Sequence, residues 1–347
     1  MFNLEFLQYM LAKFNDLSIL VLGDYFLDKY LYIDADKNEP SLETGLTAYQ
    51  VVGRKLAPGA AGTVAGNLKA LGVGNVTALG FIGKDGEGSD LISGLKAIGV
   101  ITDFLVSTDE KVTPTYTKPM LQDKSGTHEI NRLDIKNWTK TSEKLEYEIT
   151  SRMLDIAINY DAIIVLDQVT ETGCGVITPN IREVLGDMGN RANMPLIYAD
   201  SRAHTGMFKN IILKCNKYEA LKAVNLSMDT EPDEDTIFYC GKRISERNGK
   251  PVFITMGEKG QLVFDKDLVY NVPAIKTKGP LDICGAGDST TAGIVCGLCC
   301  GASPQDAALL GNIIASITIQ QIGQTGTASP EQVVKRFMEA FDGTITD

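Results

Sequence analysis

The chain has 347 residues, of which 44% are hydrophobic and 22% are charged, a composition typical of a folded globular protein rather than a disordered or fibrous one. Lys and Arg number 33 against 44 Asp and Glu, and the resulting net charge of -11 disfavours nucleic acid and anionic membrane surfaces as partners. Seven cysteines without a disulfide framework, and the lack of a signal-peptide or membrane-spanning pattern, favour a cytoplasmic protein with reduced thiols.

Apolar runs alternate with helical patterns along most of the chain. Short β-rich runs predict buried strands at residues 18–23, 76–81, 102–106, 162–166, 195–199, 211–213 and 252–255. Helices are predicted between them at residues 61–71, 91–98, 142–160 and 181–191. This alternation predicts an α/β fold with a doubly wound, mostly parallel sheet and helices on both faces.

Two segments interrupt this alternation. Residues 30–52 and 112–133 alternate polar and apolar side chains with no clear helix inside them. In a doubly wound fold, such stretches are expected to form a small accessory sheet, so we predict a β lid from segments near 30–57 and 110–135. No linker rich in Pro, Gly or Ser divides the chain, and we predict one domain over residues 1–347.

The most informative segment is residues 282–290, which read DICGAGDST. It follows a β-rich stretch and precedes a long run of small residues, which predicts a glycine-rich turn that opens a helix. Gly285 and Gly287 permit a tight path in which backbone N–H groups face an anion, and the helix dipole adds to this potential. We predict that the helix terminus keeps Asp288 ionised and that Asp288 is a general base for an attacking hydroxyl. The alternative is that it only caps the helix.

The segment DICGAGDST resembles the D-T-x-G-A-G-D signature of the PfkB/ribokinase family of carbohydrate kinases. Further segments resemble the family in the same order along the chain. They are GDYFLD at 23–28, PGAAGTVAGN at 58–67, GFIGKDGEG at 80–88, NKYE at 216–219 and TMGEKG at 255–260. No P-loop motif occurs, and no G-x-G-x-x-G follows the first strand, which argues against other nucleotide folds. The resemblance implies a ribokinase-like fold.

Within that family, the chain looks most similar to the kinase domain of bacterial heptose-phosphate kinases, the relatives of ADP-heptose synthase. The similarity includes LGDYFLDKY at 22–30 and GQTGTASP at 323–330. It implies an ATP-dependent sugar or sugar-phosphate kinase that transfers the γ-phosphoryl group to a hydroxyl, as a heptose 7-phosphate 1-kinase does. The alternatives are a nucleoside or ribose kinase of the same family and a catalytically silent sugar-sensing relative. Ala60 and Thr63, which stand where the family has Gly and Asn, motivate the last alternative.

The resemblance also implies roles for the matching residues. Beside the base Asp288, the residues that would stabilise the moving phosphoryl group are Gly285, Ala286 and Gly287. The residues that would hold the acceptor are Asp28, Gly59, Thr63, Asp167 and Arg132. The residues that would bind the nucleotide are Asn216, Glu219, Thr255, Gly257, Gly260 and Asn312.

The same resemblance implies ATP and Mg²⁺ as cofactors and a small sugar or sugar phosphate as partner. Glu219 would reach Mg²⁺ through water, and Asp282 would lie beside a monovalent cation such as K⁺. If the acceptor carries a phosphate, the basic residues proposed to grip it are Arg132, Lys118 and Lys29. Homodimers that form through the lid are common in the family, and the predicted edge at residues 30–33 suits such a contact.

Overall fold

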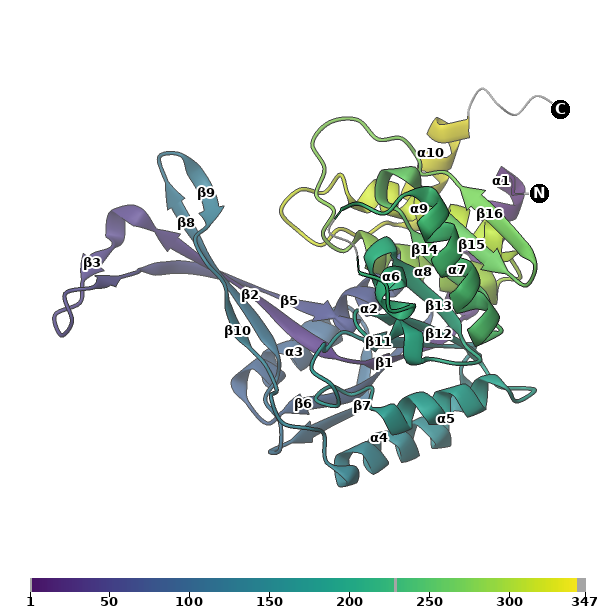
Figure 1. Cartoon of the computed structure of the whole chain (residues 1–347). Helices are drawn as coiled ribbons and strands as arrows, with labels where there is room; N and C mark the ends of the chain where they lie inside the picture. The colour runs from purple at the N-terminus through teal and green to yellow at the C-terminus, as the bar shows by residue number, and fades with distance from the viewer. Residues whose placement is uncertain (1, 228–229, 342–347) are drawn as a thin grey trace.

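The computed structural model describes residues 2–227 and 230–341, and within them a nine-stranded sheet forms the core (Figure 1). Its strand order is β16-β15-β14-β13-β12-β11-β1-β6-β7. The strands are β1 (Ser18–Gly23), β6 (Asn75–Gly83), β7 (Ile101–Thr108), β11 (Ala162–Asp167), β12 (Leu196–Ser201), β13 (Ile212–Asn216), β14 (Val252–Thr255), β15 (Gln261–Asp265) and β16 (Leu268–Val272). All pairs from β7 to β14 are parallel, whereas β15 and β16 are antiparallel, which confirms the mostly parallel sheet.

Helices cover both faces of this sheet, as predicted. The helices are α1 (Leu4–Lys13), α2 (Ala61–Ala70), α3 (Gly86–Ala97), α4 (Glu143–Ile156), α5 (Pro179–Gly189), α6 (Lys217–Ala223), α7 (Glu234–Asn248), α8 (Ala286–Cys299), α9 (Pro304–Thr318) and α10 (Pro330–Phe341). In β1, Ile19 and Val21 pack toward α1, α2, α8 and α9, whereas Leu20 and Leu22 pack toward α4 and α5. Within the described ranges, no helix has the length and hydropathy needed to cross a bilayer.

A second, smaller sheet projects from the core as the predicted lid (Figure 1). Its strand order is β10-β8-β2-β5, and β9 pairs with β8. The lid strands are β2 (Tyr25–Asp34), β5 (Val51–Ala60), β8 (Thr115–Asp123), β9 (Gly126–Glu129) and β10 (Leu133–Ile135). The pair β3 (Glu39–Pro40) and β4 (Thr47–Ala48) lies at the far end of the arm formed by β2 and β5.

The lid joins the core directly after the first strand. Gly23 ends β1 with φ of 152°, and a Cβ there would lie 2.2 Å from the carbonyl oxygen of Leu166. Only glycine tolerates this close approach, which lets the chain leave β1 and enter β2 one residue later. The carboxyl ends of β1 and β11 to β14 therefore meet the root of the lid at one edge of the sheet, where α/β folds place their ligands.

Candidate active site

The predicted glycine-rich turn, residues 282–287 (the motif turn), includes the first two residues of α8. Gly285 is the N-cap residue in the left-handed region, with φ of 78°, and a Cβ there would lie 2.5 Å from the Thr325 methyl carbon. Asp288 lies in the first turn of α8 rather than at the cap, so the interpretation that it only caps the helix is wrong. The motif turn thus presents a helix N-terminus beside a carboxylate, an arrangement suited to phosphate chemistry.

The Asp288 side chain is half-buried in the site. Burial, reinforced by the charge of Asp200, raises its pKa to about 7, while Lys214 and Arg202 limit the rise. Desolvation therefore opposes the ionisation that the helix terminus was predicted to favour, and the role of Asp288 as general base stays a prediction. A carboxyl with a pKa of about 7 suits a general base that works near neutral pH.

A buried ion pair below the motif turn was missed by the sequence reasoning. Lys214 Nζ in β13 lies 2.7 Å from Asp200 Oδ2 in β12, and each side chain is 7% exposed. A Cβ on Gly287 would lie 2.9 Å from Lys214 Nζ, so the ammonium group sits directly against the turn. Lysine is almost never buried unpaired, so a lysine inside the apolar run ILKCN was an available signal.

Asn216 and Glu219 form a capping box at the start of α6. The Asn216 Oδ1 accepts the backbone N–H groups of Tyr218 and Glu219, and Glu219 Oε2 accepts the N–H of Asn216 at 2.7 Å. Burial and then the charge of Asp200 raise the pKa of Glu219 to about 7. In the described ranges, no three acidic, His or Cys side chains are grouped so that they could hold a metal ion.

The other predicted nucleotide residues lie at the end of β14 and in α9. Thr255 ends β14, and Gly260 has φ of 92° with a hypothetical Cβ 2.2 Å from the Val272 carbonyl oxygen, so glycine is required there. Asn312 Nδ2 donates to the carbonyl oxygens of Val272 and Pro273 at 3.1 and 2.9 Å, and its Oδ1 accepts from Gln261. The amide of Asn312 therefore holds the chain after β16 in place.

Three predicted acceptor residues converge beside the motif turn. Asp28 in β2 pairs with Lys118 in β8 at 3.2 Å, and Lys118 also donates to the Tyr30 hydroxyl at 3.1 Å. A Cβ on Gly59 would lie 2.7 Å from Asp28 Oδ2, so the glycine leaves room for that carboxylate. The Thr63 methyl group lies 3.8 Å from the position of a Cβ on Gly285. The root of the lid thus meets the helix terminus that carries Asp288.

A small cavity of about 40 Å³, here called the side cavity, lies between the lid and the core. Its lining residues are Phe26, Pro114, Tyr116, Lys136, Asn137, Gln168, Val169, Thr170, Glu171 and Arg202. Lys136 Nζ lies 3.5 Å from Glu171 Oε1 across it. The charge of Arg202 lowers the pKa of both Asp288 and Glu219, which connects the side cavity electrostatically to the site. A larger groove, of about 680 Å³, lies elsewhere, between α1 and α10.

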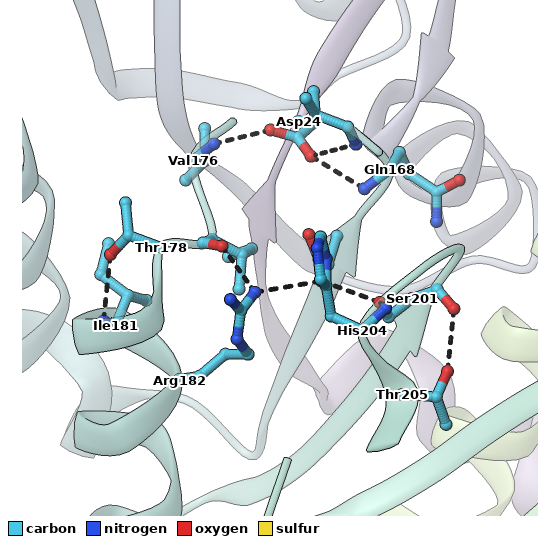
Figure 2. A network of polar contacts seen from close by, with 12 residues as sticks. Asp24, Gln168, Val176, Thr178, Ile181, Arg182, Ser201, His204 and Thr205 are labelled. Carbon is cyan, nitrogen blue, oxygen red and sulfur yellow. Dashed lines mark hydrogen bonds and ion pairs between the residues drawn. The ribbon is translucent and has the colours of Figure 1, made fainter. Parts of the chain in front are cut away.

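Asp167 and Arg132 are placed differently from the other predicted acceptor residues. The Asp167 side chain is 3% exposed, and its Oδ2 accepts from Ser201 at 2.8 Å and contacts Arg182 and His204 Nδ1 at 3.4 and 2.9 Å. This buried environment, part of which is shown in Figure 2, turns the carboxylate toward protein rather than an open site. Arg132 makes a two-pronged pair with Asp134 and lies over the ring of Tyr116, which lines the side cavity.

Asp282 links the motif turn to the segment after α9. Its Oδ1 accepts the N–H of Cys284 at 3.0 Å, and its Oδ2 accepts the N–H of Gly323 at 3.0 Å. Its backbone N–H donates to the Ile319 carbonyl oxygen at 2.8 Å. Asp282 therefore holds the two loops together, and its role beside a monovalent cation stays a prediction.

Comparison with known proteins assigns this chain to a family. The model described as pfkB family carbohydrate kinase matches residues 26–332. The Bifunctional protein HldE of Geotalea uraniireducens is 27% identical over 327 residues, which cover 94% of this chain and 64% of that protein. The corresponding protein of Gluconobacter oxydans is 25% identical over 338 residues, which cover 96% and 67%. The chain thus spans less than two thirds of the length of the first of these relatives.

Solved structures show the same fold. Escherichia coli phosphofructokinase-2 in complex with substrates and products superposes with a TM-score of 0.70 at 16% identity, covering 93% of this chain and 99% of that one. Arabidopsis thaliana ribokinase complexed with ribose and ATP gives a TM-score of 0.67 at 18% identity, covering 92% and 98%. The ribokinase-like α/β fold predicted from the sequence is confirmed.

Proposed function

This chain belongs to the pfkB family of carbohydrate kinases, and we propose that it transfers the γ-phosphoryl group of ATP to a hydroxyl of a sugar or sugar phosphate similar to heptose 7-phosphate. The observation that carries the proposal is the position of Asp288. It lies in the first turn of α8, has a pKa of about 7, and stands beside the buried Lys214–Asp200 pair. The motif similarity to heptose-phosphate kinases supports the choice of acceptor.

The transfer would proceed by positioning and charge stabilisation. The Asp288 carboxylate would take the proton of the acceptor hydroxyl. The hydroxyl oxygen would bond to the γ-phosphorus while the bond between the γ-phosphorus and the β,γ-bridging oxygen breaks, which releases ADP. The motif turn, with Gly285, Ala286 and Gly287, would stabilise the charge on the moving group, and Lys214 beneath Gly287 would add a fixed positive charge. These groups are already in place in the folded chain, so little reorganisation is needed.

The nucleotide would lie along the carboxyl ends of β13 and β14. Thr255, Gly257 and Gly260 would shape its groove, and Asn312 would hold the adjoining chain. Bound Mg²⁺, held by Glu219 and Asn216 through water, would neutralise charge on the phosphates.

The acceptor would lie between the root of the lid and α8. Asp28 would bind its hydroxyl groups, with Gly59 and Thr63 beside it. Where the acceptor carries a phosphate, Lys118 and the two cations that line the side cavity, Arg202 and Lys136, would bind it. Arg132, which lies over the ring of Tyr116, would add a positive charge at the rim of the side cavity.

We also propose that two copies join through the lid. Val51 and Val52 in β5 and Leu133 and Ile135 in β10 are each at least 41% exposed on the two outer strands of that sheet. These side chains lie on the two opposite edges of the lid sheet, and either edge suits pairing with a second copy. The sheet edge predicted at residues 30–33 is wrong, because β2 lies between β5 and β8 and pairs with both. Monomeric behaviour in light scattering at micromolar concentration would contradict this part of the proposal.

A panel of acceptors with ATP and Mg²⁺ tests the main proposal. ADP release would be measured with heptose 7-phosphate, fructose 6-phosphate, ribose and adenosine, and with Asp288→Asn as the blank for background hydrolysis. We expect release that depends on one sugar or sugar phosphate. Preference for adenosine or ribose would indicate the alternative kinases of the family. Tight sugar binding with no ADP release by the unmodified chain would indicate a silent sugar-sensing relative.

The pH dependence of activity should report the raised pKa of Asp288. Only the ionised carboxylate accepts a proton, so we expect kcat/KM to rise with pH through about 7 and then level off. The folded-state pKa lies above the ordinary value of 3.8, so the contribution of this group to stability is full below that pH and is lost as pH rises through about 7. A kcat/KM profile that stays flat across neutral pH would contradict the role of Asp288.

A further inference from the structure

Asp24 occupies the junction between the core and the lid. It follows β1, precedes β2 and is 3% exposed. Its Oδ2 accepts the backbone N–H groups of Gln168 and Val169 at 2.8 and 3.0 Å, and its Oδ1 accepts the N–H of Val176 at 2.7 Å (Figure 2). A single side chain therefore binds both ends of residues 168–176, here called the wall segment.

The wall segment forms one side of the side cavity. Its first four residues, 168–171, line that cavity opposite Tyr116 of the lid and beside Arg202. At its far end, a Cβ on Gly175 would lie 2.7 Å from Asp24 Oδ1, so a glycine allows the close approach of the backbone to the carboxylate. The shape of the cavity thus depends on the bonds that Asp24 makes.

A second buried carboxylate, Asp167, lies next to the wall segment on the side of the core. Asp167 directly precedes the wall segment and is held by Ser201, Arg182 and His204. Burial and the nearby charge of Asp167 raise the pKa of Asp24 to about 6, and the three backbone N–H groups oppose that rise. Placing two carboxylates together away from water is costly, and hydrogen bonds must satisfy both of them. A loop that merely connects β11 to α5 needs no such arrangement.

We propose that Asp24 is a positioning residue for the acceptor: by binding both ends of the wall segment, it fixes the wall against which the part of the sugar remote from the reacting hydroxyl lies. The inference rests on the proposed kinase function. Asp24 acts through the wall segment and leaves the motif turn and the nucleotide groove untouched. Its loss should therefore weaken acceptor binding far more than ATP binding or the chemical step.

The test is the variant Asp24→Asn, which keeps the size of the side chain but replaces one acceptor oxygen by an NH₂ group. Losing hydrogen bonds to a charged group is expected to raise the acceptor KM by about tenfold or more, with the ATP KM and kcat within about twofold. In parallel, hydrogen exchange in peptides covering 168–176 should become faster. Asp161→Asn is the matched control, because Asp161 accepts the Ser18 N–H at 2.8 Å at the opposite end of β11.

A second variant keeps the test decisive if Asp24→Asn does not fold. Gly175→Ala places a methyl group against Asp24 Oδ1 and should raise the acceptor KM in the same selective way. Equal changes in the acceptor and ATP KM values, or unchanged exchange in the wall segment, would overturn the inference. If the unmodified chain phosphorylates no acceptor, the proposed function is overturned, and with it the role of Asp24 in positioning the acceptor. Hydrogen exchange in the wall segment would still decide whether Asp24 holds that segment.

Discussion

Replacing Asp288 by asparagine is expected to lower kcat by about 10²–10⁴-fold while ATP still binds. Asparagine has the shape of the aspartate but cannot accept the hydroxyl proton. The substitution also removes a half-buried group whose pKa is raised to about 7, so the folded chain should lose no stability at neutral pH. The measurements are steady-state ADP release, ATP binding by calorimetry and thermal unfolding.

The first turn of α9 offers a matched control for this variant. Asp306 lies in the first turn of α9, as Asp288 lies in the first turn of α8. Asp306 is at the opposite end of the helix pair, away from the motif turn, and it contacts Ser303. Asp306→Asn removes a similar favourable interaction with a helix dipole, worth about 0.3–1 kcal/mol, and should leave kcat unchanged. Undiminished turnover in Asp288→Asn, or an equal loss in Asp306→Asn, would remove Asp288 from the role of base.

The sequence predicted those parts of the molecule that depend on local pattern. Residues 18–23 and 162–166 are apolar runs bounded by polar residues, and both became central parallel strands. The glycines of DICGAGDST predicted the motif turn because few other sequences permit a left-handed residue directly before a helix. The alternating segments predicted the lid because their period excludes a helix.

The parts that were missed depend on contacts between distant segments. Lys214 and Asp200 belong to different strands, and only the pairing of β12 with β13 brings them together below the motif turn. Asp167 ends β11, as expected for a residue that holds the acceptor. Its carboxylate, however, is buried against Arg182 of α5 and His204 in the loop after β12. The raised pKa of Asp288 has the same origin, because burial is a property of the assembled core and not of the motif.

Lys214→Met should be the most destabilising of these substitutions. Removing one member of a buried ion pair leaves an uncompensated charge, which typically costs about 3–5 kcal/mol. Here the uncompensated group is Asp200. Its Oδ2 would still accept from the Thr291 hydroxyl at 3.3 Å. Turnover should also fall, because the positive charge beside Gly287 disappears and the pKa of Asp288, which Lys214 lowers, would rise further. Urea unfolding and ADP release measure the two effects separately.

The double variant Lys214→Met, Asp200→Leu separates stability from catalysis. Replacing both charges by apolar groups removes the stranded carboxylate and should recover most of the lost unfolding free energy, while turnover stays low. Lys84→Met is the control, because Lys84 and Asp109 are also 2.7 Å apart but exposed, and such a pair contributes about 0–1 kcal/mol. If turnover returned together with stability in the double variant, Lys214 would serve only the fold. If the double variant is stable but its turnover stays low, the Lys214 ammonium group is among those that stabilise the transferred phosphoryl group.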